Sequence, residues 1–200
     1  NKMFDERIKK EAEKVEFKIG NETFSLLHTQ IEDASFGASK IYLYANERMV
    51  QEINLEKEIV DLDKNLYSAK GYFYAGILSG NFLDENVGTN RTSFDIVATT
   101  DDDSEISMEK IILNASESVQ EYLVDYLSEV KGKKEERVRT FIKNEAPQYG
   151  HLLKYMPEDV AAIKPYLSDS KLDDELYKIK RRFDTQLKKD NEDIIKKINK

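Results

Sequence analysis

The residues best suited to chemistry lie in a charged stretch at 83–96, which reads LDENVGTNRTSFDI. It holds the acidic residues Asp84, Glu85 and Asp95 and a single cation, Arg91, with no histidine or cysteine. A guanidinium group stays charged and can grip a phosphate through two parallel hydrogen bonds. Arg91, at the end of a loop between two strand-like runs, could therefore reach an anion held by a neighbouring domain. In phosphoryl transfer, such a cation stabilises the charge that develops on the γ-phosphate.

Arg91 has an alternative, purely structural role. Its side chain could pair with Asp84, Glu85 or Asp95 and so hold the turn in shape. Residue chemistry taken by itself favours this second role, because all three acids are its close neighbours in the sequence.

No other part of the sequence has the pattern of a self-sufficient active site. His28 and His151 lie far apart and the chain has no cysteine, so we expect no metal site and structural or surface roles for both histidines. The acidic run at 101–103 could bind a cation, although its composition is more typical of a solvated linker. Phosphate-binding glycine motifs and a nucleophile elbow are absent from the sequence.

The composition is that of a globular protein, with 40% hydrophobic and 35% charged residues. No run approaches the roughly eighteen apolar residues of a membrane-spanning helix, and no signal-peptide pattern follows Asn1. We therefore expect a cytoplasmic protein with no membrane partner. Residues 1–105 carry 12 basic and 21 acidic side chains, which argues against nucleic-acid binding there. Residues 106–200 carry 19 basic and 18 acidic side chains, a balance typical of solvated helices.

Hydrophobic periodicity predicts an α+β fold: a mixed β-sheet with a crossover helix, followed by an all-helical region. A segment without apolar residues, TTDDDSE at 99–105, predicts a boundary between an α+β domain at 1–105 and a helical domain at 106–200. The expected elements are a short helix or connector at 1–14, strands at 15–20, 22–28, 38–47, 48–53, 70–80 and 92–99, and one crossover helix at 55–66.

Beyond the boundary, apolar residues recur at helical spacing. One stripe runs from Val119 to Ile142 and ends before Pro147. Another runs from Leu172 to Ile198 and approximates a heptad pattern. This last stripe could pack on its own domain or form a coiled coil with a second copy, and the sequence does not decide between the two.

Two segments of the sheet region resemble the second domain of MutL-type ATPases. YLYANERMVQEINL resembles a strand–NGR–strand segment, and YFYAGILSGNFLDENVGTNRTSFDI resembles a later strand that runs into a vDvNVhpaK..v.F loop. Asp84, Asn86 and Val87 stand at the D, N and V of that pattern, Arg91 stands near its lysine, and Phe94 stands near its phenylalanine. A heat-shock chaperone has an analogous lNvSRe loop that contains arginine. MutL, this chaperone, gyrase B and histidine kinases form the GHKL superfamily.

The resemblance covers about residues 15–97 and implies a ribosomal-protein-type β-α-β transducer domain, followed here by helices. It implies that an ATP-binding domain of the same protein lies upstream of Asn1. ATP and Mg would bind there, so no cofactor is expected in this chain. Arg91 would act as the γ-phosphate sensor, in trans to the ATP-binding domain.

The resemblance also implies supporting roles. Asp84 and Asn86 would hold the loop in shape, and Asn46 and Arg48 would lie at the strand turn. Glu47 replaces the glycine of NGR, so the chain resembles a bacterial GHKL ATPase of MutL-like or chaperone-like type more than a mismatch-repair protein itself.

Two alternatives of another class remain open. The chain could be a non-enzymatic interaction module with a helical dimerisation tail. With either function, a homodimer could form through helices at 114–145 or 170–199. The lysine-rich stretches at 131–139 and 178–189 could also bind nucleic acid.

Overall fold

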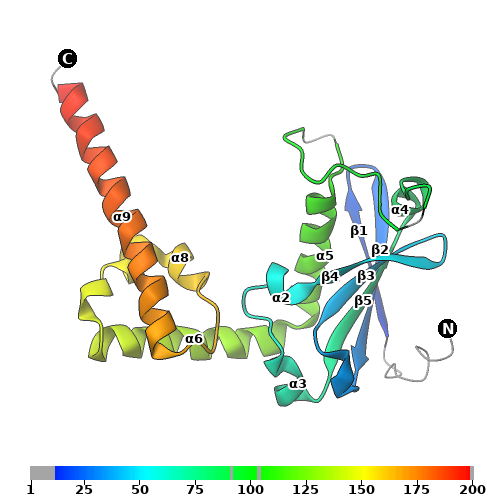
Figure 1. The fold of residues 1–200 in the computed structure, drawn as a ribbon, viewed down its shortest axis with the longest axis horizontal. Helices are drawn as coiled ribbons and strands as arrows, with labels where there is room; N and C mark the ends of the chain where they lie inside the picture. The colour runs from blue at the N-terminus through cyan, green and yellow to red at the C-terminus, as the bar shows by residue number, and fades with distance from the viewer. Residues whose placement is uncertain (1–11, 91, 103–104, 199–200) are drawn as a thin grey trace. The chain divides into compact units, whose positions relative to one another are not determined.

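The computed structural model describes residues 12–90, 92–102 and 105–198. The chain divides into two compact units, residues 1–127 and 128–200. The first unit combines a sheet with helices and the second is helical, which confirms the predicted fold class (Figure 1). The first helix after the acidic segment, α5 (Met108–Tyr122), packs on the sheet, so the first compact unit extends past residue 105. Among the described residues, no helix combines the length and apolar character needed to cross a membrane.

The first unit is built on a five-stranded mixed sheet with the strand order β1-β2-β5-β3-β4. The central β5 runs parallel to β3 and antiparallel to β2, and every other pair is antiparallel. The strands are β1 (Glu13–Ile19), β2 (Glu22–Ile31), β3 (Lys40–Ala45), β4 (Arg48–Asn54) and β5 (Phe73–Ser79). The predicted hairpin at Gly20-Asn21, the strand turn at Asn46-Glu47 and the central position of the fifth strand are confirmed.

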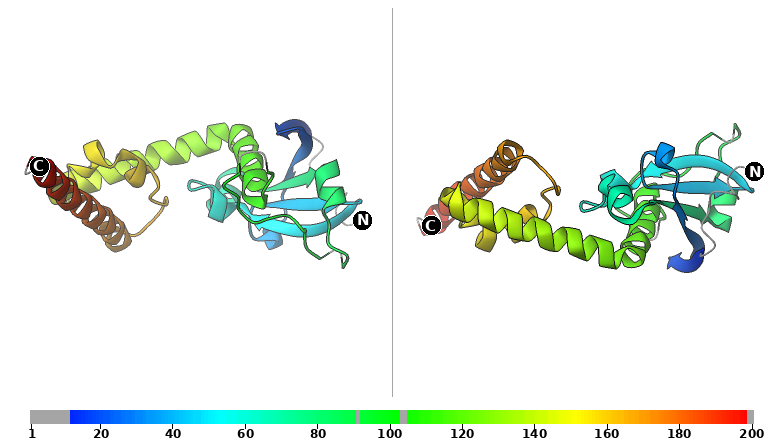
Figure 2. Two further views of the ribbon diagram at one scale, coloured as in Figure 1. Left: turned by 90° about the horizontal axis from the view of Figure 1, so that it is seen from above. Right: turned by 90° about the horizontal axis from the view of Figure 1, so that it is seen from below.

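Helix α5 covers one face of this sheet, as two further views show (Figure 2). Alternate residues of β2, including Phe24 and Leu26, are fully buried, as expected for a strand with one covered face. On α5, Ile111, Ala115 and Val119 are buried at intervals of four residues, which places them on one side of the helix. Burial of these two matching apolar faces holds the helix on the sheet.

The prediction of one crossover helix at 55–66 is wrong in detail. The structure has two short helices, α2 (Leu55–Glu58) and α3 (Asn65–Lys70), with an extended residue, Ile59, between them. The Asp63 carboxylate accepts a hydrogen bond from the Asn65 backbone N–H at 2.8 Å, an alternative that Asp offers to helical bonding. The apolar residues that suggested a helix are buried in either arrangement.

The predicted final strand at 92–99 is also wrong. Within this described segment only Phe94 forms a bridge, with Val87, and no ladder follows. The carbonyls of Val97 and Ala98 instead accept hydrogen bonds from the first backbone N–H groups of α5, at Met108 and Glu109. The segment thus provides hydrogen-bond acceptors for the first N–H groups of α5, which have no partner within the helix itself. Most of the helix or connector predicted at 1–14 lies outside the described residues, and Glu13 and Lys14 begin β1.

The second unit consists of helices, as predicted, and packs around its own apolar core. Its elements are α6 (Val124–Asn144), which begins in the first unit, η2 (Pro147–Tyr149), α7 (Leu152–Tyr155), α8 (Pro157–Ala161) and α9 (Asp169–Ile198). The core includes Val138 and Ile142 of α6 and Leu172, Leu176 and Ile179 of α9.

The apolar stripe of α9 has two different halves. Its first half is buried in the second unit as far as Ile179, and Phe183 is partly buried beside it. Its second half is exposed, with Leu187 at 43%, Ile194 at 54% and Ile195 at 57%. The prediction that the stripe packs on its own domain is therefore confirmed for the first half of the stripe only.

Candidate functional site

The loop that carries Arg91 is closed at its base by regular hydrogen bonds. It follows the short helix α4 (Asn81–Glu85), which the sequence did not predict. Val87 and Phe94 form a β-bridge, and the Gly88 N–H donates to the Ser93 carbonyl at 2.9 Å. These two contacts hold Val87 and Gly88 beside Ser93 and Phe94.

Arg91 itself lies outside the described residues. Its two predicted roles, reaching an anion or pinning the turn, therefore both stay predictions. Of the three acids that could pin it, Asp84 is bonded elsewhere in the structure, to the backbone of another strand turn. Glu85 is the last residue of α4, before the loop, and Asp95 follows the bridge residue Phe94. The Asp95 backbone N–H donates to the Asn86 carbonyl at 2.8 Å.

A hydrogen-bonded clamp joins Asp84 to Asn46. The Asp84 carboxylate accepts from the Asn46 backbone N–H at 2.6 Å, and the Asn46 side-chain amide donates to the Asp84 carbonyl at 3.3 Å. Asn46 and Glu47 have φ of 49° and 63°, the left-handed values of a tight turn whose twist suits a two-residue hairpin. Asparagine tolerates this backbone conformation well, whereas glutamate residues rarely adopt it. The clamp thus links the turn between β3 and β4 to the helix at the base of the Arg91 loop.

Asn86 and Arg48 occupy simpler positions. The Asn86 side-chain amide donates to the Phe82 carbonyl at 2.9 Å, which ties the residue after α4 back onto that helix. This contact agrees with a supporting role for Asn86. Arg48 is the first residue of β4 and is exposed, and its side chain makes no ion pair with any residue that the structure describes.

We expect Asp84→Ala to loosen the turn between β3 and β4. The change removes a charged acceptor from the Asn46 N–H, a bond that contributes about 1 kcal/mol at an exposed site. Amide hydrogen exchange at Asn46 should therefore accelerate about fivefold. Glu85→Ala is the matched control, because this neighbouring side chain has no partner among the described residues. Equal exchange in both variants would contradict the clamp.

His28 is a buried part of the first unit, in agreement with its predicted structural role. Its side chain is 1% exposed, and its Nδ1 lies 2.8 Å from the Tyr74 hydroxyl. The ring stacks on Tyr122 of α5 with centroids 4.7 Å apart, and the Tyr122 hydroxyl accepts a hydrogen bond from Gln30 at 3.0 Å. Burial lowers the pKa of His28 below its usual 6.5, and the nearby carboxylate of Glu13 opposes this shift in part.

The burial of His28 beside Tyr74 and Tyr122 predicts a loss of folding stability in mild acid. Because the pKa of His28 is lowered in the folded state, the unfolded chain takes up a proton first as the pH falls below about 6.5. The stabilisation is complete above that pH. This contribution to the free energy of unfolding is lost as the pH falls through the lowered pKa of His28. The loss is at most about 1.4 kcal/mol for each pH unit. His28→Gln should flatten this decline in urea-unfolding free energy.

The control for this prediction lies in the other unit. A matched His151→Gln variant should retain the full decline of unfolding free energy with falling pH, because His151 belongs to the second unit. A flat profile in unmodified protein would contradict the assignment of the decline to His28.

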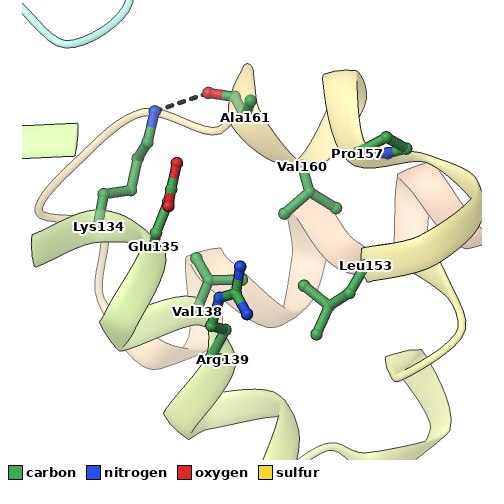
Figure 3. Close-up of a pocket in the computed structure, with 8 residues that line it drawn as sticks. All are labelled: Lys134, Glu135, Val138, Arg139, Leu153, Pro157, Val160 and Ala161. Atoms are coloured by element: carbon green, nitrogen blue, oxygen red, sulfur yellow. Dashed lines mark hydrogen bonds between the residues drawn. The ribbon is translucent and has the colours of Figure 1, made fainter. Parts of the chain in front are cut away.

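The second unit contains a small cavity between α6, α7 and α8 (Figure 3). Its volume is about 130 Å³, and its apolar wall includes Val138, Leu153 and Val160. Lys134 on α6 is only 6% exposed, and its Nζ donates to the Ala161 carbonyl at 2.6 Å. That carbonyl ends α8, where the last carbonyls of a helix have no partner within it and attract a cation. Lys134 therefore joins two helices of the unit.

Within the described ranges, no group of three or more His, Cys, Asp or Glu side chains could hold a metal ion. The arrangement at the end of the sheet is instead a supported loop: a bridge, a short helix and a clamp to a second turn. The sequence indicated Asp84 and Asn46 separately, but it did not indicate that they bond to each other, because they are 38 positions apart.

Comparison of the chain with family models, with curated proteins and with solved structures gives no match.

Proposed function

We propose that this chain is the transducer part of a GHKL-type ATPase, with a helical extension, and that the loop at 87–94 delivers Arg91 to the γ-phosphate of ATP. The ATP would be bound by an N-terminal domain of the same protein. The chain would then contribute a catalytic cation without holding a nucleotide pocket of its own. ATP and Mg would be cofactors of the longer protein, which would act in the cytoplasm.

The observation that carries this proposal is the clamp between Asn46 and Asp84. The two segments that resemble the MutL-like pattern are separate in the sequence. The Asn46 backbone N–H of the first segment nevertheless donates to the Asp84 carboxylate of the second at 2.6 Å. The strands β3 and β5 are parallel neighbours, so the turn after β3 and the helix after β5 lie at the same end of the sheet, and the clamp adds a direct bond between them. This bond supports the proposal, because in a shared site the turn would hold the base of the loop.

The mechanism follows from the chemistry of the loop. The γ-phosphate gains negative charge at its oxygens during transfer, and a cation held in place lowers the barrier. The bridge between Val87 and Phe94 and the bond between Gly88 and Ser93 restrict the loop, so less conformational entropy is lost when its tip meets a phosphate. Closure of the ATP-binding domain onto this unit would complete the site and couple hydrolysis to movement of the helices.

The proposal is tested by the protein that the intact gene encodes. We expect the sequence upstream of Asn1 to carry an acidic general base, an asparagine suited to Mg and a DxGxG motif. We also expect the purified longer protein to hydrolyse ATP, and a version without the Asn46–Asp84 clamp to lose ATP-dependent closure. An upstream region with no such motifs would contradict the proposal.

A second candidate is a non-enzymatic interaction module. It is favoured by the exposed second half of the α9 stripe, where Leu187, Ile194 and Ile195 lie outside the described core of their unit. Such a module would bind a partner through its helical tail and would show no response to ATP. Sedimentation of the longer protein with and without ATP separates the two, because only the ATPase should change shape with nucleotide.

A further inference from the structure

A single helix joins the two compact units. The units divide between Leu127 and Ser128, and α6 runs without interruption across that division (Figure 1). Further along α6, the Lys134 Nζ bonds to the Ala161 carbonyl at 2.6 Å, and Val138 enters the core of the second unit. The stretch at 128–133 precedes both attachments. Its own helical stability therefore decides how rigidly the two units are joined.

This joining stretch contains Gly132, in the middle of α6. Five of the six residues at 128–133 are exposed, and only Val130 is buried. A glycine in an exposed helix interior is destabilising relative to alanine, because its backbone loses more conformational freedom when the helix forms. The ion pair of Lys133 with Glu129, at 2.7 Å, spans the glycine, but exposed pairs of this kind contribute little. The helix is thus weak at this point.

No packing requirement explains the glycine at this position. Each of the other seven glycines has a stereochemical reason. Three of them have the left-handed φ that favours glycine: Gly20, Gly37 and Gly71. At the other four an added Cβ would lie 2.8–3.3 Å from a neighbouring atom: Gly76, Gly80, Gly88 and Gly150. Gly132 is helical, and its added Cβ would meet nothing within 4 Å beyond the adjacent helix backbone.

We propose that Gly132 is a hinge at which α6 opens locally and bends, so that the two units can change their relative orientation. In a regular α-helix the N–H groups at 133–136 donate to the carbonyls at 129–132. Opening this turn breaks those bonds, while the exposed side chains around it lose little packing. Segments with exposed backbone bonds and few apolar contacts are the ones that open most readily. The inference holds whether or not the chain is part of an ATPase.

The absence of cysteine from this chain makes the test direct. Glu85→Cys and Lys171→Cys place one spin label on an exposed residue of each unit. Double electron–electron resonance then gives the distribution of the distance between the labels, which we expect to be broad. A second pair, Lys143→Cys and Lys171→Cys, lies within the second unit and should give a narrow distribution. Equally narrow distributions for the two pairs would overturn the hinge.

Gly132→Ala should narrow the distribution between the units. The added methyl group raises helix propensity and has open space around it, so the change stabilises α6 without disturbing a contact. We expect amide hydrogen exchange at 133–136 to slow about fivefold, which is the propensity difference between glycine and alanine expressed as an equilibrium constant. A distribution as broad as that of the unmodified protein would overturn the proposal.

Thr140→Ala is the matched control. Thr140 is an exposed residue of the same helix, and alanine raises helix propensity there as well. It lies two residues beyond Val138, where α6 already packs in the core of the second unit. The control should therefore change neither the distance distribution nor the exchange at 133–136. Equal narrowing by Thr140→Ala would contradict a hinge at Gly132, because general stabilisation of α6 would then explain the result.

Discussion

If the chain is the proposed part of a GHKL-type ATPase, Arg91→Ala should lower ATP turnover by that ATPase about 10³-fold, the loss seen when a cation at the transferring phosphate is removed. Nucleotide affinity should stay within about threefold, because the cation acts mainly on charge that develops in the transition state. Steady-state hydrolysis and equilibrium binding of a fluorescent ATP analogue measure the two effects separately.

Two further variants make this result specific. Arg91→Lys keeps the charge but not the planar pair of donors, so we expect partial activity. Arg181→Ala removes an exposed arginine of α9 that has no ion-pair partner among the described residues, and it should leave turnover unchanged. Full turnover in Arg91→Ala would instead assign Arg91 to pinning its own loop.

Leu176→Ala should destabilise the second unit by about 2–5 kcal/mol. Leu176 is 0% exposed and lies in the core that joins α9 to α6. Its truncation removes buried apolar surface and leaves a cavity that a close-packed core fills only in part. Urea unfolding followed by circular dichroism should show the loss as a lower midpoint for the helical signal.

Leu187→Ala is the matched control for this prediction. It makes the same chemical change on the same helix, but Leu187 is 43% exposed. We expect its effect on unfolding to stay within about 0.5 kcal/mol. Equal losses from both variants would show that the second half of the α9 stripe is covered in solution, for example by a second copy.

The parts of the fold that the sequence predicted are those fixed by local pattern. Alternation in β2 and the turn at Gly20-Asn21 identify a hairpin, because a strand with one buried face repeats every two residues. Helical spacing likewise predicts the helical region after residue 105 and the helix α9, although the structure divides the predicted stripe from Val119 to Ile142 between α5 and α6. These signals need no knowledge of distant partners.

The failed predictions depend on what lies nearby in space. Residues 92–99 have a strand-like pattern, yet no described strand pairs with them, and the carbonyls of Val97 and Ala98 bond to the start of α5 instead. The stretch 55–66 has helical spacing, but Ile59 is extended and Asp63 competes for the backbone. The clamp of Asn46 to Asp84 cannot be derived from the sequence, because it is a property of packed elements.

The position of Arg91 in a crystal structure of the longer protein, bound to a non-hydrolysable ATP analogue, tests the central claim most directly. The proposal predicts a guanidinium nitrogen at about 2.7–3.2 Å from a γ-phosphate oxygen, the range of a hydrogen bond. A guanidinium group paired with Glu85 or Asp95 of its own loop, with the nucleotide out of reach, would contradict it.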